Sequence, residues 1–182
     1  YPDALNICLS AVHDPLATEE VALEQCLGRV LRHDQISRVH VPPWNRAMMD
    51  GYAVQACDVS RASSQNPVTL TQIDEVPAGR MSSKKIGPGE TIRIMTGACV
   101  PEGADAVVKV ESTRRIGTQV EFREAVGENP YIIAKGQDLA PGATAAGTGS
   151  LVTPALMGVL AACGSGVPQQ RPEHRARDLR DI

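Results

Sequence analysis

The sequence has few aromatic residues, no excess of basic charge and no long apolar run. Aromatic side chains make up 3% of the 182 residues, so platforms for stacking single-stranded nucleic acid are largely missing. The formal net charge is −3 and no basic stripe stands out, which argues against nucleic acid as a partner. Hydrophobic residues make up 42%, so we expect a globular core of Val, Ile, Leu, Ala and Met.

The sequence also lacks the marks of a membrane or metal-thiolate protein. No apolar run approaches the roughly 18 residues of a membrane span, and no signal peptide is visible, so we expect a cytoplasmic protein. No cysteine pair forms CxxC, and none has zinc-finger spacing with histidine. An odd number of cysteines scattered through apolar sequence favours buried thiols in a reducing compartment. They are Cys8, Cys26, Cys57, Cys99 and Cys163.

The apolar pattern predicts helices near the two ends of the chain and strands between them. Residues 3–12 and 154–163 have helical spacing, and residues 24–27 predict a short helix that Gly28 ends. Short β-branched runs between Gly/Pro turns predict strands at residues 68–73, 91–95, 106–110, 119–122 and 131–133. The spacing has no βαβ rhythm. We therefore predict a mixed α+β fold that is mainly β, and a disordered polar tail at residues 169–182.

Three polar residues lie on turns where functional groups are often found. Asp50-Gly51 predicts a sharp turn that leaves the carboxylate exposed. Thr96 ends a predicted strand, and Asp138 follows Gly136 on another turn. Taken singly, each is ordinary turn chemistry, because Asp in a turn more often forms an Asx-turn than acts as a catalyst.

Taken together, the segments that contain these residues resemble a known family. They read VPPWNRAMMDGYAV at residues 41–54, PAG at 77–79, PGETIRIMTGACVPEGADAVV at 88–108 and GQD at 136–138. This order and spacing is similar to the MoeA/gephyrin E-domain family, whose pattern contains "MDGYA", "PAG", "RIMTGAxxPxGADAVV" and "GED". The resemblance covers about residues 3–168 and is confined to the family's N-terminal region.

The resemblance implies a fold organisation and an activity. It implies an outer, dimer-related subdomain from residues 1–38 and 139–168, with an irregular β subdomain inserted at residues 39–138. The family transfers molybdenum from molybdate to adenylylated molybdopterin in a Mg²⁺-dependent reaction that releases AMP. Its enzymes are homodimers, and a molybdopterin adenylyltransferase-type partner fits the same pathway.

The resemblance also implies roles for individual residues. Asp50, Thr96 and Asp138 would be the catalytic residues that this chain contributes to the family's cleft. Asp50 and Asp138 are hard oxygen ligands that suit Mg²⁺. Arg46, beside the Asp50 turn, is a candidate contact for an anionic cofactor, with a structural role equally open. Arg93 lies within a strand pattern, which favours a structural ion pair.

The chain departs from the family pattern most strongly at its end. The family continues with "RRPRVAI" and a "TGDE" segment that opens a central α/β domain, whereas residues 169–175 begin similarly and then lose the apolar pattern. A truncation or frameshift near residue 170 would produce this sequence. Two functions stay open: part of a molybdenumtransferase that is inactive alone, or a non-catalytic dimerisation and scaffold module.

Overall fold

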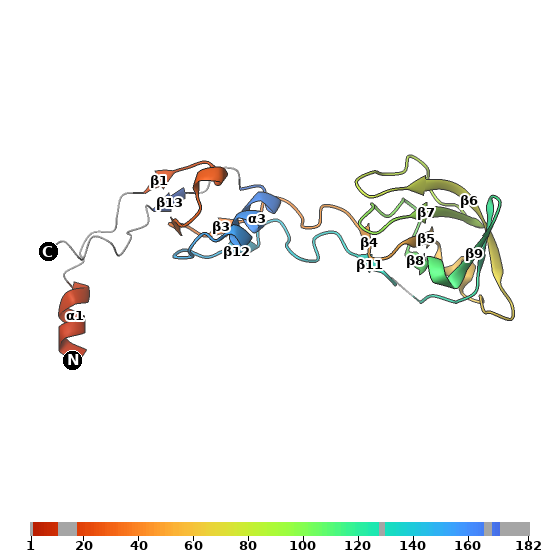
Figure 1. Cartoon of the computed structure of the whole chain (residues 1–182), viewed down its shortest axis with the longest axis horizontal. Helices are drawn as coiled ribbons and strands as arrows, with labels where there is room; N and C mark the ends of the chain where they lie inside the picture. Colours follow the sequence, from red (N-terminus) through yellow and green to blue (C-terminus); the bar gives the residue numbers. More distant parts are fainter. Residues whose placement is uncertain (1, 11–17, 128–129, 166–168, 172–182) are drawn as a thin grey trace. The chain divides into compact units, whose positions relative to one another are not determined.

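The computed structural model describes residues 2–10, 18–127, 130–165 and 169–171. The chain forms two compact units (Figure 1). Unit 1 comprises Tyr1–Val39 and Leu139–Ile182, and unit 2 comprises His40–Asp138. Unit 2 is therefore inserted into unit 1, because the chain leaves unit 1 once and later returns to it.

Unit 2 is built on a six-stranded mixed sheet with the strand order β8-β5-β7-β6-β10-β9. The strands are β5 (Gly51–Val54), β6 (Val68–Val76), β7 (Glu90–Ile94), β8 (Ala106–Lys109), β9 (Thr113–Ile116) and β10 (Gln119–Phe122). Only the β6–β7 pair in this sheet is parallel. The prediction of a mixed α+β fold that is mainly β is confirmed, and the helices are few.

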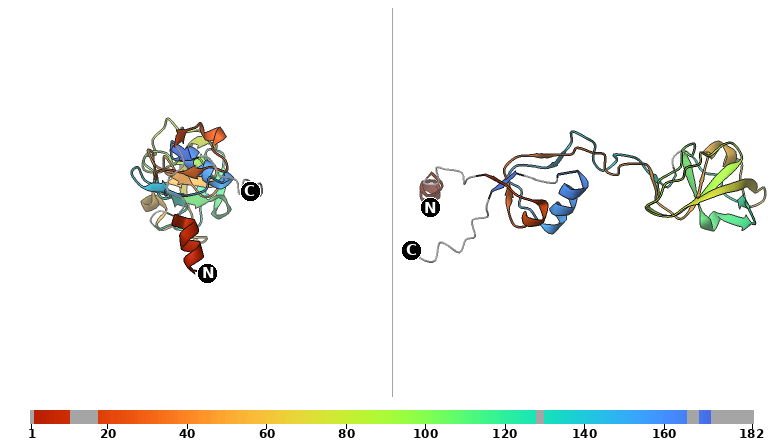
Figure 2. Two further views of the ribbon diagram at one scale, coloured as in Figure 1. Left: turned by 90° about the vertical axis from the view of Figure 1, so that its left-hand side faces the viewer. Right: turned by 90° about the horizontal axis from the view of Figure 1, so that it is seen from above.

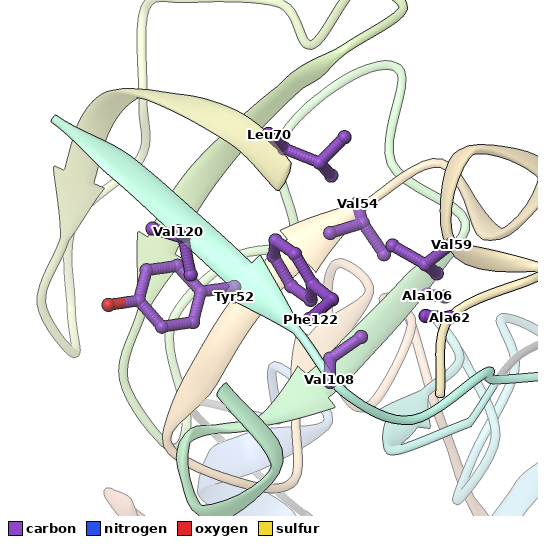
Figure 3. Close-up of a cluster of buried hydrophobic side chains, with 9 residues drawn as sticks. All are labelled: Tyr52, Val54, Val59, Ala62, Leu70, Ala106, Val108, Val120 and Phe122. Atoms are coloured by element: carbon purple, nitrogen blue, oxygen red, sulfur yellow. The ribbon is translucent and has the colours of Figure 1, made fainter. Parts of the chain in front are cut away.

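The sheet buries apolar side chains on both faces. Along β5, Tyr52 and Val54 belong to one core cluster, while Ala53 between them belongs to another, as the two-residue period of a strand requires. The first cluster also receives Val108 from β8 and Phe122 from β10 (Figure 3). Since β8 and β10 are far apart in the strand order, the sheet must curl for both to reach one cluster.

Short elements complete unit 2 around the sheet. They are β4 (Arg46–Ala47), α2 (Ala56–Val59), η2 (Val110–Ser112) and β11 (Ile132–Ile133), and β4 pairs with β11. The carboxylate of Asp105 accepts a 2.6 Å hydrogen bond from the Ala56 amide at the start of α2. This contact satisfies a helix-terminal donor, so Asp105 has a structural role.

Unit 1 has a smaller core beneath a short helix. Its elements are α1 (Pro2–Ser10), β1 (Glu19–Glu20), η1 (Leu23–Gln25), β2 (Val30–Leu31), β3 (Gln35–Ile36), β12 (Thr144–Ala146), α3 (Pro154–Ala162) and β13 (Gln169–Arg171). α3 packs beside η1 and β12 (Figure 2), and its Leu160 is buried with Cys26 and Leu31. Thr153 caps α3 by accepting the Leu156 amide hydrogen bond.

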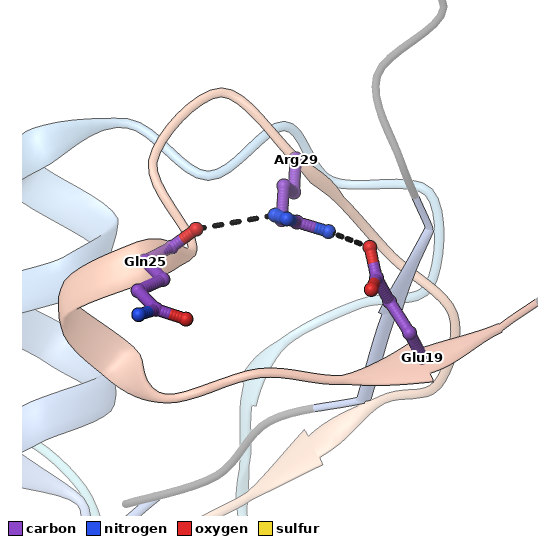
Figure 4. Close-up of polar contacts among 3 residues, drawn as sticks. All are labelled: Glu19, Gln25 and Arg29. Carbon is purple, nitrogen blue, oxygen red and sulfur yellow. Dashed lines mark hydrogen bonds and ion pairs between the residues drawn. The ribbon is translucent and has the colours of Figure 1, made fainter.

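An arginine connects two of these elements on the surface of unit 1. Arg29 forms an ion pair with Glu19 of β1, and its Nε donates to the Gln25 carbonyl at the end of η1, at 3.1 Å (Figure 4). A cation at the carboxyl end of a helical turn also offsets the exposed carbonyl groups there. The contact therefore fixes η1 against β1.

The structure differs from the sequence-based expectations in the tail and at several side chains. Residues 169–171 were expected to be disordered but form β13 between β1 and β2, because backbone ladder bonds do not depend on apolar side chains. The rest of the predicted tail, residues 172–182, lies outside the described residues. Two of the five thiols, Cys8 and Cys57, are exposed rather than buried. The expectation of core methionines is wrong for three exposed residues, Met48, Met49 and Met81.

Candidate functional site

The backbone around Asp50 is held by two neighbouring segments. Ala47 accepts a hydrogen bond from the Gly97 amide (2.8 Å) and donates one to the Ala98 carbonyl (3.0 Å). The Val110 amide donates to the Asp50 carbonyl at 3.1 Å. The turn that carries Asp50 is therefore tied both to the turn after β7 and to the end of β8.

Asp50 and Thr96 contact each other directly. The Thr96 amide and hydroxyl both donate to Oδ1 of Asp50, at 2.7 and 2.6 Å. The hydroxyl bond, the amide bond and the nearby charge of Arg93 hold the pKa of Asp50 below its ordinary value of 3.8. Both side chains are exposed, so the second carboxylate oxygen, Oδ2, stays available to a ligand.

The same pairing occurs once more in the described part of the chain, in unit 1. The Thr148 amide and hydroxyl donate to Oδ1 of Asp34, at 2.7 and 2.8 Å. The backbone bond from Thr148, followed by its hydroxyl bond, lowers the pKa of Asp34. Two donors on one carboxylate oxygen therefore indicate a held, ionised carboxylate, and they do not by themselves indicate a reaction.

The surroundings of Asp50 add charged groups that sequence reasoning left without a role. A cavity of about 430 Å³ is lined by Met49, Asp50, Lys109 and Glu111. Lys109 reaches it because Gly51 of β5 pairs in register with Lys109 of β8. Pairing the segments "DGYAV" and "AVVKV" as antiparallel strands would have predicted that Lys109 lies next to Asp50.

The pairing depends on glycine at position 51. A Cβ on Gly51 would lie 2.0 Å from the Val108 carbonyl oxygen, far inside contact distance. The close approach of β5 and β8 thus requires glycine beside Asp50. The backbone next to Asp50 is therefore part of the β5–β8 pairing.

Asp138 makes no direct contact of the hydrogen-bonding kind with Asp50 among the described residues. Asp138 is exposed, and its amide donates to the Val41 carbonyl at 2.9 Å. Among the described residues, no hydrogen bond or ion pair joins its carboxylate to Asp50 or Thr96. The joint role of the two predicted metal ligands therefore stays a prediction.

Arg46 and Arg93 take different positions around the site. Arg46 is half-buried in β4, next to the Thr96 turn, and its Nε is a buried donor without a hydrogen-bond partner. An orphaned donor of this kind is costly unless a ligand or water satisfies it. Among the described residues, no ion pair includes Arg93, contrary to expectation. Its guanidinium lies 5.0 Å from the centre of the Tyr52 ring, in a cation–π contact.

The donor set suits Mg²⁺ only in part. Asp50 offers one free oxygen and Glu111 supplies a second carboxylate at the same cavity. Within the described ranges, no cluster of three or more His, Cys, Asp or Glu side chains is arranged to hold a metal ion. Mg²⁺ commonly takes one or two carboxylates and completes its shell with waters and substrate phosphates, so these residues fit a shared rather than a closed site.

Comparison with known proteins identifies the family of this chain. Residues 1–164 match the family described as MoeA N-terminal region (domain I and II), and the chain belongs to that family. It is 42% identical over 161 residues to molybdopterin molybdenumtransferase from Bacillus subtilis, covering 85% of this chain and 37% of that protein. It is 41% identical over 155 residues to molybdopterin molybdenumtransferase 2 from Mycobacterium tuberculosis, covering 83% and 38%.

A solved structure with the same fold supports this assignment. The crystal structure of the molybdopterin biosynthesis MoeA protein from Pyrococcus horikoshii superposes with a TM-score of 0.89 at 33% identity, over 94% of this chain and 45% of that one. The chain thus spans less than half the length of these relatives. None of the helices in the described ranges has the length and apolarity that crossing a lipid bilayer requires.

Proposed function

We propose that this chain is the N-terminal part of a molybdopterin molybdenumtransferase in molybdenum cofactor biosynthesis. Its substrates would be molybdate and adenylylated molybdopterin, and AMP would be released. The observation that carries the proposal is the exposed, ionised carboxylate of Asp50, which both donors of Thr96 hold beside a cavity. Asp50 and Thr96 lie in the two most specific family motifs.

Each residue has a proposed task that follows from its contacts. Thr96 occupies Oδ1 of Asp50 and so directs Oδ2 as a single-oxygen ligand for Mg²⁺. Mg²⁺ bound there would neutralise charge on the phosphate oxygens of the departing AMP. Arg46, whose Nε lacks a partner, would donate to an anionic group of the substrate. Asp138 would act from its own position in unit 2 as a second carboxylate of the larger cleft.

The chain is proposed to work in a homodimer and to be inactive alone. The described residues contain too few metal-ligating side chains for a closed site, and the residues that complete it would come from regions beyond this N-terminal part. The same observation supports the second candidate, a non-catalytic dimerisation or scaffold module. The two candidates differ in whether this chain can support turnover when the remaining regions are supplied.

A chimera separates these candidates. Residues 1–164 would replace the matching N-terminal region of the Bacillus subtilis relative, and AMP release would be followed with adenylylated molybdopterin, Mg²⁺ and molybdate. We expect turnover on the order of 1 s⁻¹ from the chimera and none from the 182-residue chain alone. A folded chimera that releases no AMP would instead favour the scaffold module.

A further inference from the structure

Tyr131 has a backbone conformation that tyrosine rarely adopts. Its φ is 57°, and it is the one non-glycine residue in the described ranges with positive φ. In this region the Cβ of an L-residue crowds its own backbone, so bulky residues are found there only where other contacts hold them. Such contacts can therefore point to a functional arrangement.

The contacts of Tyr131 lead to the walls of the Asp50 cavity. Its carbonyl accepts a 2.8 Å hydrogen bond from the Met48 amide, two residues before Asp50. Its ring lies under Lys109, with Nζ 5.2 Å from the ring centre, a distance at which a cation is attracted to an aromatic face. The unusual backbone thus supports both the turn that carries Asp50 and the one lysine that lines the cavity.

Lys109 lines the cavity without a carboxylate at ion-pair distance among the described residues. None of the ion pairs formed by the described residues includes it. The Tyr131 side chain, followed by the charges of Glu124 and Glu111, raises the pKa of Lys109 above its ordinary value. An ammonium group has three donors, so the contact with the Tyr131 ring leaves donors for a ligand in the cavity.

We propose that Lys109 binds an oxygen of a tetrahedral oxoanion in the Asp50 cavity, and that Tyr131 is the positioning residue that holds Lys109 there. The inference rests on the proposed function, whose substrates offer two such groups, the molybdate ion and the nucleotide phosphate. Asp50 and Glu111 line the same cavity and repel a lone oxoanion. Binding therefore requires Mg²⁺ as well as the anion.

The test is a side-chain NMR titration of the lysines in the intact 182-residue chain. The probes are molybdate and AMP, each with and without Mg²⁺. We expect the Lys109 Nζ signal to shift saturably with one of the two anions, and only when Mg²⁺ is present. Lys85 is the internal control, because it lies in unit 2 and forms an exposed ion pair with Glu102. The anion that produces the shift identifies the group that Lys109 binds.

Variants separate binding from positioning. Lys109→Met should raise the Kd of that anion at least about tenfold, as expected for the loss of one charge-assisted hydrogen bond, whereas Lys85→Met should leave it unchanged. Tyr131→Gly removes the ring but accepts the same φ, so the fold should persist while the Kd rises about threefold. Tyr131→Phe keeps the ring and should change the Kd less than Tyr131→Gly.

Three results would overturn the inference. In the first, the NMR signals of Lys109 and Lys85 shift equally. In the second, the Asp50 amide signal shifts and the Lys109 signal does not. In the third, no probe shifts the Lys109 signal. None of these results touches the proposed function, which stands if the chimera described above releases AMP. Conversely, a chimera that releases no AMP counts against the proposed function whatever Lys109 does.

Discussion

Replacing Gly51 by alanine should separate the two strands that bring Asp50 and Lys109 together. The new Cβ would lie 2.0 Å from the Val108 carbonyl oxygen, 2.9 Å from the carbonyl carbon and 3.3 Å from the Lys109 Cα. Non-bonded carbon atoms prefer about 3.5–4.0 Å. All three obstacles are backbone atoms, so no side-chain rotation relieves the clash, and β5 and β8 must move apart by about 1 Å or more.

The cost follows from the position of β5 in the sheet. β5 pairs with β7 on one side and β8 on the other, so a shift away from β8 strains the second ladder. Overpacking costs about 1–3 kcal/mol, and the rigid obstacle places Gly51→Ala near 3 kcal/mol. For a domain of about 100 residues, this lowers Tm by roughly 12–24 °C.

Fluorescence of Trp44 is a suitable assay, because it is the only tryptophan of the chain and lies in unit 2. Gly127→Ala is the matched control, since Gly127 also lies in unit 2 and a Cβ there would meet nothing within 4 Å. We expect a large loss of stability for Gly51→Ala and almost none for Gly127→Ala. Equal Tm values for the two variants would refute the close-approach argument.

Three further predictions concern the core, the site and the thiols. Phe122→Ala removes a fully buried ring and should cost about 3–5 kcal/mol by denaturant unfolding; a loss below 1 kcal/mol would contradict its place in the core. The pKa of Asp50 should lie below 3.8 by NMR titration and rise in Thr96→Val, because the Thr96 hydroxyl is the main cause of its depression. The pKa of Asp50 is lower in the folded than in the unfolded chain. The stability that the Asp50–Thr96 contact contributes is therefore present above pH 3.8 and is lost as the pH falls through the depressed pKa. An unchanged Asp50 pKa in Thr96→Val would argue against the contact. In the folded chain, a thiol reagent should react rapidly with Cys8 and Cys57, which are exposed, and it should reach all five cysteines only after unfolding. Rapid reaction of a third thiol in the folded chain would conflict with the burial of the other three.

Side-chain patterns predicted the strands that supply the core and missed those defined by backbone pairing. The expected strand at residues 119–122 has the bounds of β10, and that at residues 68–73 continues to Val76 in β6. β5 was missed because "DGY" predicts a turn, although its residues 52–54 are buried on both faces of the sheet. β9 and β13 were missed because their polar sequences hide a ladder that only their partner strands reveal.

The candidate site was predictable where it rests on contiguous motifs. Asp50 and Thr96 were identified from two segments, and their direct hydrogen bonds agree with a shared place in the fold. Lys109 and Glu111 could not be found in this way, because their place depends on the register of β5 with β8. Among the described residues Arg93 has a cation–π contact in place of the expected ion pair, and only the strand register shows that Tyr52 lies opposite it.

The most direct test of the account is AMP release by the chimera with Asp50→Asn. The substitution keeps the shape of the side chain and removes the charge that would hold Mg²⁺, so we expect the rate to fall by about 10²-fold or more. Asp58→Asn is the matched control, because this half-buried carboxylate of unit 2 accepts a hydrogen bond from the Gly89 amide and does not line the cavity. The account predicts that Asp58→Asn releases AMP at nearly the rate of the parent chimera and that Asp50→Asn releases it far more slowly. Equal rates for the two variants would contradict it.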